Sequence, residues 1–132
     1  MRLVMDLQAC QTTGSRFRGI GRYSMALAKA MLARAGGHEI WVALSGAFPE
    51  TIEAIRSDMD GLLPPERVRV FDVPQNVSGG NPGHDWQRRA AEALRESWLR
   101  ELQPDLVHIS SLFEGLEDDA VVHIGSDVAA SA

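Results

Sequence analysis

The stretch DLQACQTTGSRFRGIGRYSMALAKAM, residues 6–31, joins the end of an apolar run to a segment of strong helix formers. The apolar run, residues 3–7, predicts a short buried strand. The helix formers that follow predict an α-helix ending at the glycine pair 36–37. The junction carries glycines, three arginines and a tyrosine, and it is longer than a plain strand-to-helix connection. This unit therefore predicts a strand and a helix joined by a basic, glycine-containing loop.

The rest of the chain repeats this alternation of apolar and helical segments. Residues 38–46, 67–74 and 105–110 predict three further buried strands. Residues 49–61 and 85–103 have helical periodicity. Strands that alternate with helices predict a Rossmann-like α/β fold, a doubly wound parallel sheet with helices on both faces. Ligands of such sheets bind beyond the carboxyl ends of the strands, where the basic loop lies.

The predicted organisation is a single domain over residues 1–125, followed by a frayed tail over 126–132. Periodicity also predicts which helix faces are buried. Asp6, inside the first strand, requires a backbone N–H group or an arginine as partner if it is buried. The predicted buried faces are Ile20, Tyr23, Leu27, Ala30 and Met31 in the first helix, and Ala91, Leu94, Trp98 and Leu102 in the third, with Arg95 among its exposed residues.

Composition bounds the class of protein. The chain has 132 residues, 45% hydrophobic and 23% charged, which is typical of a folded globular protein. A formal net charge of −5 speaks against general binding of nucleic acid. The single cysteine, Cys10, favours a reducing compartment, and Asp6 interrupts any signal-peptide core. We therefore expect a cytoplasmic protein.

Several cofactor and metal sites can be tested against the motifs. A dinucleotide fingerprint needs a third glycine three residues after Gly21, where Ser24 stands, and an acid at the end of the second strand. No Gly-Lys-Ser or Gly-Lys-Thr of a Walker loop occurs. No histidine pair has metal-ligand spacing, and one cysteine cannot build a structural zinc site. We expect no cofactor and no metal.

The basic loop admits two interpretations. Gly19 and Gly21 precede a helix N-terminus, where free N–H groups favour an anion, and Arg16, Arg18 and Arg22 could add contacts to phosphate. Alternatively, the glycines only turn the chain and the arginines are solvated. His108, in the fourth predicted strand, is similarly open between a cleft residue and a hydrogen-bonded core histidine.

Residues 6–31, together with HEIWVALSGAFPETI, RVRVFDVP and PDLVHISSLFEG, resemble the N-terminal half of family 4 retaining glycosyltransferases. The resemblance is strongest to mannosyltransferase-like bacterial members that build surface polysaccharides. It runs to about Gly125, and RGIGRYS is its most specific element. In that family two Rossmann-like domains, the GT-B arrangement, face each other across a cleft. The N-terminal domain binds the acceptor, and the C-terminal domain binds most of the nucleotide-sugar donor.

This resemblance implies roles for individual residues. Gly19 and Gly21 would let the backbone approach the donor, and Arg18, Arg22 and Tyr23 would surround the reacting sugar or the acceptor. Two further residues after the fourth strand, Ser111 and Glu114, would line the acceptor side together with His108 if it faces the cleft.

The sequence also departs from the family. The His-Asp pair of the next family strand is not matched, since His123 precedes Ile124, and the second domain with its glutamate pair is absent. We therefore expect the acceptor half of a sugar transferase, inactive alone, whose partner is a C-terminal Rossmann-like domain. The substrates would be a nucleotide-sugar, with mannose as the expected sugar, and a polysaccharide or lipid-linked acceptor.

Two points stay open. Arg88, Arg89, Arg95 and Arg100 in the third helix leave room for peripheral contact with the inner membrane face, although acids dilute this signal. The alternative function is a stand-alone, non-catalytic binding module. An uncovered apolar patch where the partner domain would dock, with a tendency to self-associate, favours the half-enzyme over the module.

Overall fold

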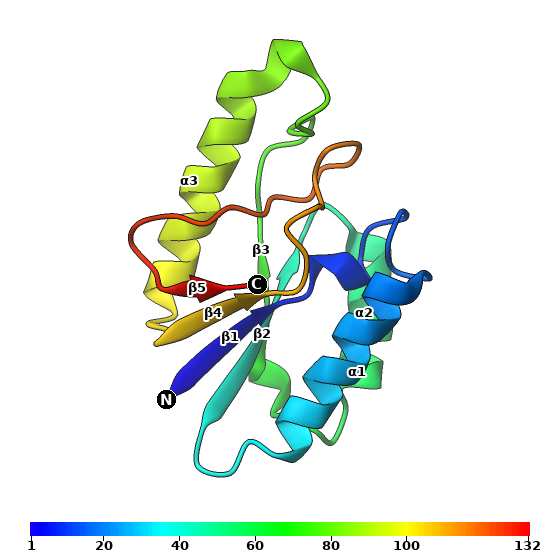
Figure 1. Ribbon diagram of the computed structural model, residues 1–132, viewed down its shortest axis with the longest axis vertical. Coiled ribbons are helices and arrows are strands. Elements are labelled where there is room, and N and C mark those ends of the chain that lie inside the picture. Colours follow the sequence, from blue (N-terminus) through cyan, green and yellow to red (C-terminus); the bar gives the residue numbers. More distant parts are fainter.

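The computed structural model describes residues 1–132 and contains one sheet of five parallel strands in the order β3-β2-β1-β4-β5 (Figure 1). The strands are β1 (Arg2–Asp6), β2 (Glu39–Ser45), β3 (Val68–Phe71), β4 (Leu106–Ile109) and β5 (Ala130–Ser131). The strand order reverses at β1, because β2 lies on one side of it and β4 on the other. This order is the Rossmann-like arrangement, so the predicted fold class is confirmed.

Three α-helices cover the two faces of the sheet: α1 (Gly19–Ala33), α2 (Pro49–Asp58) and α3 (Asp85–Glu101). Helices α1 and α2 share one apolar core with Leu3, Met5 and other sheet residues, and α3 shares a second core with Val4 and Val107. Figure 1 shows α3 on the opposite side of the sheet from α1 and α2. Short 3-10 helices form at Gln8–Cys10, Pro65–Arg67 and Pro82–His84. None of the helices combines the length and the apolar character needed to cross a lipid bilayer.

The buried face of α1 differs from the prediction. Tyr23 is 66% exposed and Ile20 is also exposed, whereas Gly21, Ser24 and Ala28 are buried. A Cβ atom on Gly21 would clash with the backbone of Ser15 and Arg16, so the start of the helix packs closely against the loop after β1. Periodicity of large apolar residues cannot reveal this contact, and Ile20 and Tyr23 are turned away from the core.

The buried face of α3 also differs, because Arg95 and not Leu94 points into the protein. Arg95 is 1% exposed, and its guanidinium donates to Asp6 from Nε at 3.1 Å and from Nη2 at 2.6 Å. The backbone N–H of Gln8 also donates to Asp6. The prediction that Asp6 needs an arginine or backbone partner is confirmed. The placement of Arg95 among the exposed residues was wrong, because a buried carboxylate in the central strand requires a counter-charge.

The connection from β4 to β5, residues 110–129, contains no helix and is held by polar side chains instead. Gln8 exchanges two hydrogen bonds with the backbone of Val121, and Arg88 donates to the carbonyl oxygens of Val77, Gly115 and Ala120. The tail over residues 126–132, which was predicted to be frayed, contains β5, and β5 pairs with β4. With Arg95 buried and Arg88 bound to carbonyl groups, α3 keeps fewer free arginines for a membrane surface than its sequence indicates.

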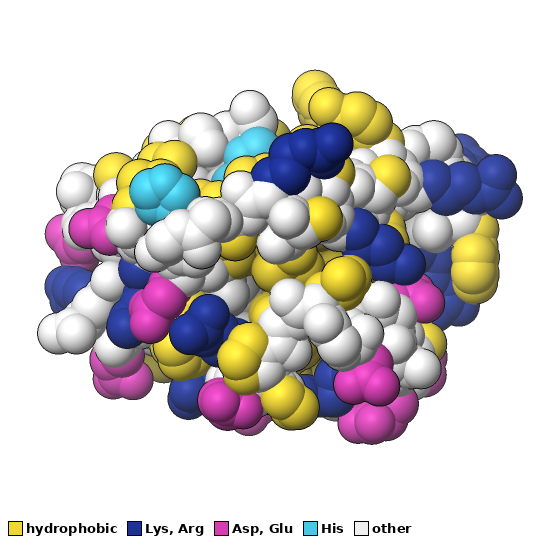
Figure 2. Space-filling model, turned by 90° about the horizontal axis from the view of Figure 1, so that it is seen from below, with side chains coloured by type: hydrophobic (Ala, Val, Ile, Leu, Met, Phe, Trp, Pro, Cys, Tyr) yellow, Lys and Arg dark blue, Asp and Glu magenta, His cyan; other side chains and the backbone are white.

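Basic, acidic and apolar side chains are interspersed over the face that Figure 2 presents, where the first strands begin. Apolar side chains reach the surface in the middle of this face.

Candidate functional site

The point where the strand order reverses lies between β1 and β4, and the loops after these two strands meet there. The N–H group of Ser110 donates to the carbonyl oxygen of Asp6, so the carboxyl ends of both strands lie side by side. In doubly wound sheets a crevice forms at such a point because the two connections leave in opposite directions. The side chains at this crevice are therefore the first candidates for a ligand site.

A pocket of about 140 Å³ lies at this position on the α1 side of the sheet. Four polar residues line it: Tyr23 and Ser24 of α1, His108 of β4 and Ser110 directly after β4. Its apolar part comes from Met5, Leu7 and Leu27. The volume is below the ~300–1,000 Å³ typical of drug-sized ligands, so the pocket suits one ring-sized group.

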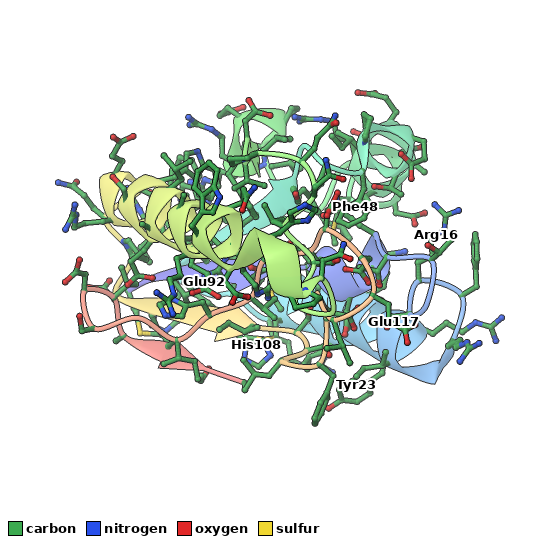
Figure 3. All side chains as sticks on the ribbon, turned by 90° about the horizontal axis from the view of Figure 1, so that it is seen from above. Arg16, Tyr23, Phe48, Glu92, His108 and Glu117 are labelled. Carbon is green, nitrogen blue, oxygen red and sulfur yellow. The ribbon has the colours of Figure 1, made fainter.

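One buried polar group of this pocket lacks a partner in the protein, and a second is already hydrogen-bonded. Ser110 Oγ is buried and has no hydrogen-bond partner, which is costly unless a ligand or water supplies one. His108 Nδ1 lies 3.1 Å from Ser131 Oγ, so His108 is hydrogen-bonded and also lines the pocket. Figure 3 shows Tyr23 and His108 near each other, with Arg16 well away from both.

Two other predicted site residues, Glu114 and Ser111, are buried. The Glu114 carboxylate accepts hydrogen bonds of 2.7 Å from Thr12 Oγ1 and Ser15 Oγ, and thereby ties the loop after β4 to the loop after β1. Ser111 Oγ accepts a hydrogen bond from the N–H group of Phe113. These contacts give both residues a role in holding the loops, and contact with a ligand is untested.

The two glycines of the basic loop have different surroundings. A Cβ atom on Gly21 would come within 2.7 Å of Arg16 Cα and closer still to the Ser15 carbonyl oxygen, so the helix packs against the loop backbone here. A Cβ atom on Gly19 would meet nothing within 4 Å. Gly21 therefore allows close packing, whereas Gly19 leaves open space at the N-terminus of α1.

The arginines of the loop do not converge on the pocket at the strand reversal. Arg18 is exposed at the N-cap of α1. Arg22 and Arg16 line a separate groove between α1 and α2. The structure thus brings Tyr23 and His108 together but places Arg22 on another side of the same helix.

Ser110, Thr12 and Ser15 were missed as site residues by the sequence analysis. Ser110 could have been found, since it follows the fourth strand directly and lies at the ligand edge. The partnership of Thr12 and Ser15 with Glu114 had no sequence signal, because about a hundred residues separate them.

Large apolar side chains are exposed in and beside the loops at this edge. Phe17 is 70% exposed and Phe113 is 87% exposed, and Leu112 and Leu116 of the same loop as Phe113 are exposed as well. Because Glu114 ties the two loops together, these side chains belong to one end of the molecule. Such exposure is typical of a surface that another protein part covers.

Two of the acidic residues after Glu114 bind backbone N–H groups of the protein. Asp119 accepts hydrogen bonds from the N–H groups of Asn76 and Val77, and Asp118 accepts one from Ala120. Burial raises the pKa of the Asp118 carboxyl above its ordinary value, and the charge of Glu114 acts in the same direction. Asp118 and Asp119 therefore hold the backbone of the segments around residues 76–77 and 120.

Cys10 is buried, and burial is the main cause that raises the pKa of its thiol to about 12. A thiol with this pKa stays protonated at neutral pH and is a poor nucleophile. No three His, Cys, Asp or Glu side chains gather as a metal site would require. The absence of a metal remains a prediction.

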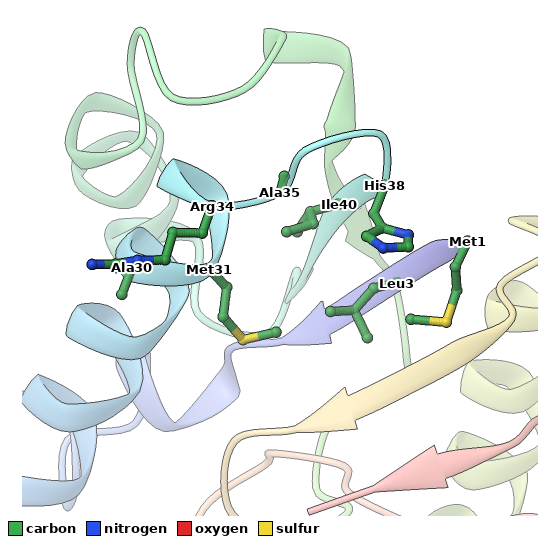
Figure 4. A pocket seen from close by; sticks show the side chains of 8 residues that line it. All are labelled: Met1, Leu3, Ala30, Met31, Arg34, Ala35, His38 and Ile40. Atoms are coloured by element: carbon green, nitrogen blue, oxygen red, sulfur yellow. The ribbon is translucent and has the colours of Figure 1, made fainter.

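A further pocket, of about 320 Å³, lies at the other end of the sheet (Figure 4). Met1, Leu3 and Ile40 of the strand region and Met31 of α1 make its lining mostly apolar. It lies where β1 and β2 begin, away from the carboxyl ends of the strands, and it offers little hydrogen-bonding chemistry. We therefore place the candidate site at the strand reversal.

The fold and this site define an α/β domain of Rossmann-like type with a polar crevice between β1 and β4. Among known proteins the chain is similar to serotype-specific mannosyltransferase WbdA of Escherichia coli, with 29% identity over 128 residues, 96% of this chain and 15% of that protein. Two further WbdA proteins of Escherichia coli are 26% identical over 102 residues, 76% of this chain and 12% of theirs. The chain thus spans less than a sixth of the relatives it matches. No family model and no solved structure matches it.

Proposed function

We propose that this chain is the acceptor-binding, N-terminal domain of a family 4 retaining glycosyltransferase of the GT-B type. It would act in transfer of mannose from a nucleotide-sugar to a polysaccharide or lipid-linked acceptor, with a C-terminal Rossmann-like domain as its partner. The proposal includes a cytoplasmic location, at the inner membrane face for a lipid-linked acceptor. The observation that carries it is the alignment of 96% of the chain with a mannosyltransferase of which it covers 15%.

The pocket at the strand reversal suits a sugar ring. Sugar hydroxyl groups both donate and accept hydrogen bonds, and Ser110 Oγ, the Tyr23 hydroxyl and the His108 ring can match both roles. Ser110 Oγ would gain the partner that the protein does not supply. We assign this pocket to one sugar unit of the substrate.

The loop after β1 would approach the donor at Gly19 and Arg18, where the backbone is open and the guanidinium is exposed. Glu114 and Gly21 would hold this loop in position, through hydrogen bonds and close packing respectively. The groups that bind the nucleotide and complete the chemistry would come from the second domain. We therefore expect no sugar transfer by residues 1–132 alone.

The exposed apolar side chains support this proposal over the stand-alone binding module. Phe17, Phe113 and Leu116 lie in loops at the ligand edge, where a second domain would cover them. The half-enzyme is expected to self-associate through this edge, whereas the module is expected to be monodisperse.

Titration with methyl α-mannoside, followed by NMR of the Tyr23 and His108 ring signals, tests the sugar pocket. We expect both rings to shift, and we expect Ser110→Ala to weaken binding roughly 2- to 10-fold through loss of one hydrogen bond. Ser57→Ala, an exposed serine of α2, is the matched control. Unshifted ring signals, or equal affinity of the Ser110 and Ser57 variants, would contradict the assignment.

The expected inactivity is tested by incubating the isolated chain with GDP-mannose and a mannoside acceptor. Transfer above the level of a heat-denatured sample would show that the chain needs no second domain. That result would overturn the half-enzyme proposal while leaving the sugar pocket intact.

A further inference from the structure

A groove of about 620 Å³ lies between α1 and α2, and it is larger than the pocket at the strand reversal. Its floor is apolar, with Met25 of α1, Ile55 of α2 and the buried Cys10. Ala26 of α1 and Ala54 of α2 also line the groove, and their small side chains leave space between the two helices. The groove does not share a lining residue with the sugar pocket at the strand reversal.

The α1 wall of this groove is basic because of an uneven distribution of charge along the sequence. Residues 11–38 contain Arg16, Arg18, Arg22, Lys29 and Arg34 but no Asp or Glu, in a chain whose net charge is −5. Three of these cations, Arg16, Arg22 and Lys29, line the groove. The segment with the highest positive charge therefore faces a cavity.

Two of these cations have no partner in the protein. Arg22 and Lys29 form no salt bridge, and they lie seven residues apart on one helix, about 10 Å along its axis. Arg16 reaches across the mouth of the groove to Glu50, with Nη1 3.9 Å from Oε1, and its Nε atom is buried without a partner. These three groups can all donate to an anion.

The α2 wall carries the opposite charge. Glu50 and Asp58 lie one near each end of α2, and both line the groove. Asp58 has no ion-pair partner. Carboxylates accept hydrogen bonds from hydroxyl groups, and they repel a ligand that is anionic along its whole length.

The mouth of the groove also carries an exposed aromatic ring. Phe17 is 70% exposed and lines the groove, and the Arg16 guanidinium lies 4.8 Å from its ring centroid. Arg16 is therefore held near the opening, beside a flat apolar surface.

We propose that the groove between α1 and α2 binds a sugar phosphate. The phosphate would lie against Arg22 and Arg16, and the hydroxyl groups would donate to Glu50 or Asp58 across the groove. A guanidinium matches phosphate oxygens well because its donors form a planar fork. The apolar floor and Phe17 would contact the carbon face of the ring.

This inference does not rest on the proposed glycosyltransferase function. The groove lies on a different side of α1 from Tyr23, so occupancy of one site does not require the other. A chain that fails to bind methyl α-mannoside at the strand reversal could still bind a sugar phosphate here.

Calorimetric titration with glucose 1-phosphate, glucose and inorganic phosphate tests the proposal. We expect glucose 1-phosphate to bind more tightly than either component, since only this ligand contacts both walls. Arg22→Gln is expected to weaken its binding about tenfold. Arg34→Gln, on the same helix but outside the groove, is the matched control and is expected to bind normally.

Methionine methyl signals give a second measurement that needs no variant. Met25 lines the groove, whereas Met31 lines the apolar pocket at the other end of the sheet. Glucose 1-phosphate should shift the Met25 methyl signal and leave that of Met31 in place. Binding no tighter than inorganic phosphate, an equal loss in Arg34→Gln, or an unshifted Met25 signal would each overturn the proposal.

Discussion

Replacing Arg95 by methionine would leave the carboxylate of Asp6 without its counter-charge in the central strand of the sheet. The exposed fractions of Asp6 and Arg95 are 0% and 1%, so water cannot substitute for the guanidinium. The carboxylate would lose the two hydrogen bonds from Arg95 and retain those from Gln8. Removing one partner of a buried ion pair costs about 3–5 kcal/mol of unfolding free energy.

This cost is large for a domain of this size, whose unfolding free energy is expected to be about 5–15 kcal/mol. The corresponding fall in Tm is about 11–18 °C, from the usual unfolding entropy per residue. Urea denaturation followed by tryptophan fluorescence measures the loss, because Trp98 packs against Phe71 with ring centroids 5.4 Å apart.

The same helix offers a matched control. Arg100 pairs with Asp127 at 3.0 Å, but both side chains are more than half exposed. We expect Arg100→Met to cost about 0–1 kcal/mol. Combining Arg95→Met with Asp6→Asn should restore part of the lost stability, since no buried charge would remain. Equal costs for the Arg95 and Arg100 variants, or no recovery in the double variant, would refute the electrostatic explanation.

Two further predictions concern the loop after β1. Gly21→Ala should lower the unfolding free energy by about 1–3 kcal/mol because its Cβ would meet the backbone of Arg16, whereas Gly19→Ala should have little effect; urea denaturation of both variants checks this, and equal effects would contradict the packing role. The pKa of Cys10 is about 12 in the folded chain against 9.0 as the ordinary value, so above pH 9 only the unfolded state loses this proton readily. Between pH 9 and about pH 12, the unfolding free energy should therefore fall by about 1.4 kcal/mol for each pH unit. Comparison with Cys10→Ala isolates the effect, and identical slopes for the two proteins would contradict it.

The alternation of strands and helices could be predicted from the sequence because it depends on local properties. Apolar runs of strand length, helix formers, and glycine or proline at the ends of segments act over a few residues. The four longer strands and all three helices were predicted in this way, and β5 was not, because its two residues form a strand only through pairing with β4. The doubly wound arrangement of the sheet followed from general rules of connection, whereas the strand order comes from the structure.

The faces of the helices could not be predicted with the same success. In α1 the close packing of Gly21 against the loop after β1 decided which face is buried at the start of the helix. In α3 the deciding factor was Asp6, 89 residues away, whose charge required Arg95 inside the protein. Both outcomes depend on tertiary contacts, and the periodicity of a single segment gives no information about them.

The same distinction between local sequence and tertiary structure applies to the candidate site. The sequence by itself determined which loops follow the strands, and it predicted that ligand-binding residues gather there, in particular around the basic loop and the end of the fourth strand. Only the tertiary structure decided that Tyr23, His108 and Ser110 share a pocket, that Arg22 faces a different groove, and that Glu114 holds the loops. The physical reason is that a parallel sheet brings together strand ends that lie far apart in the chain, and the rotation of α1 on the sheet then sets the direction of each side chain.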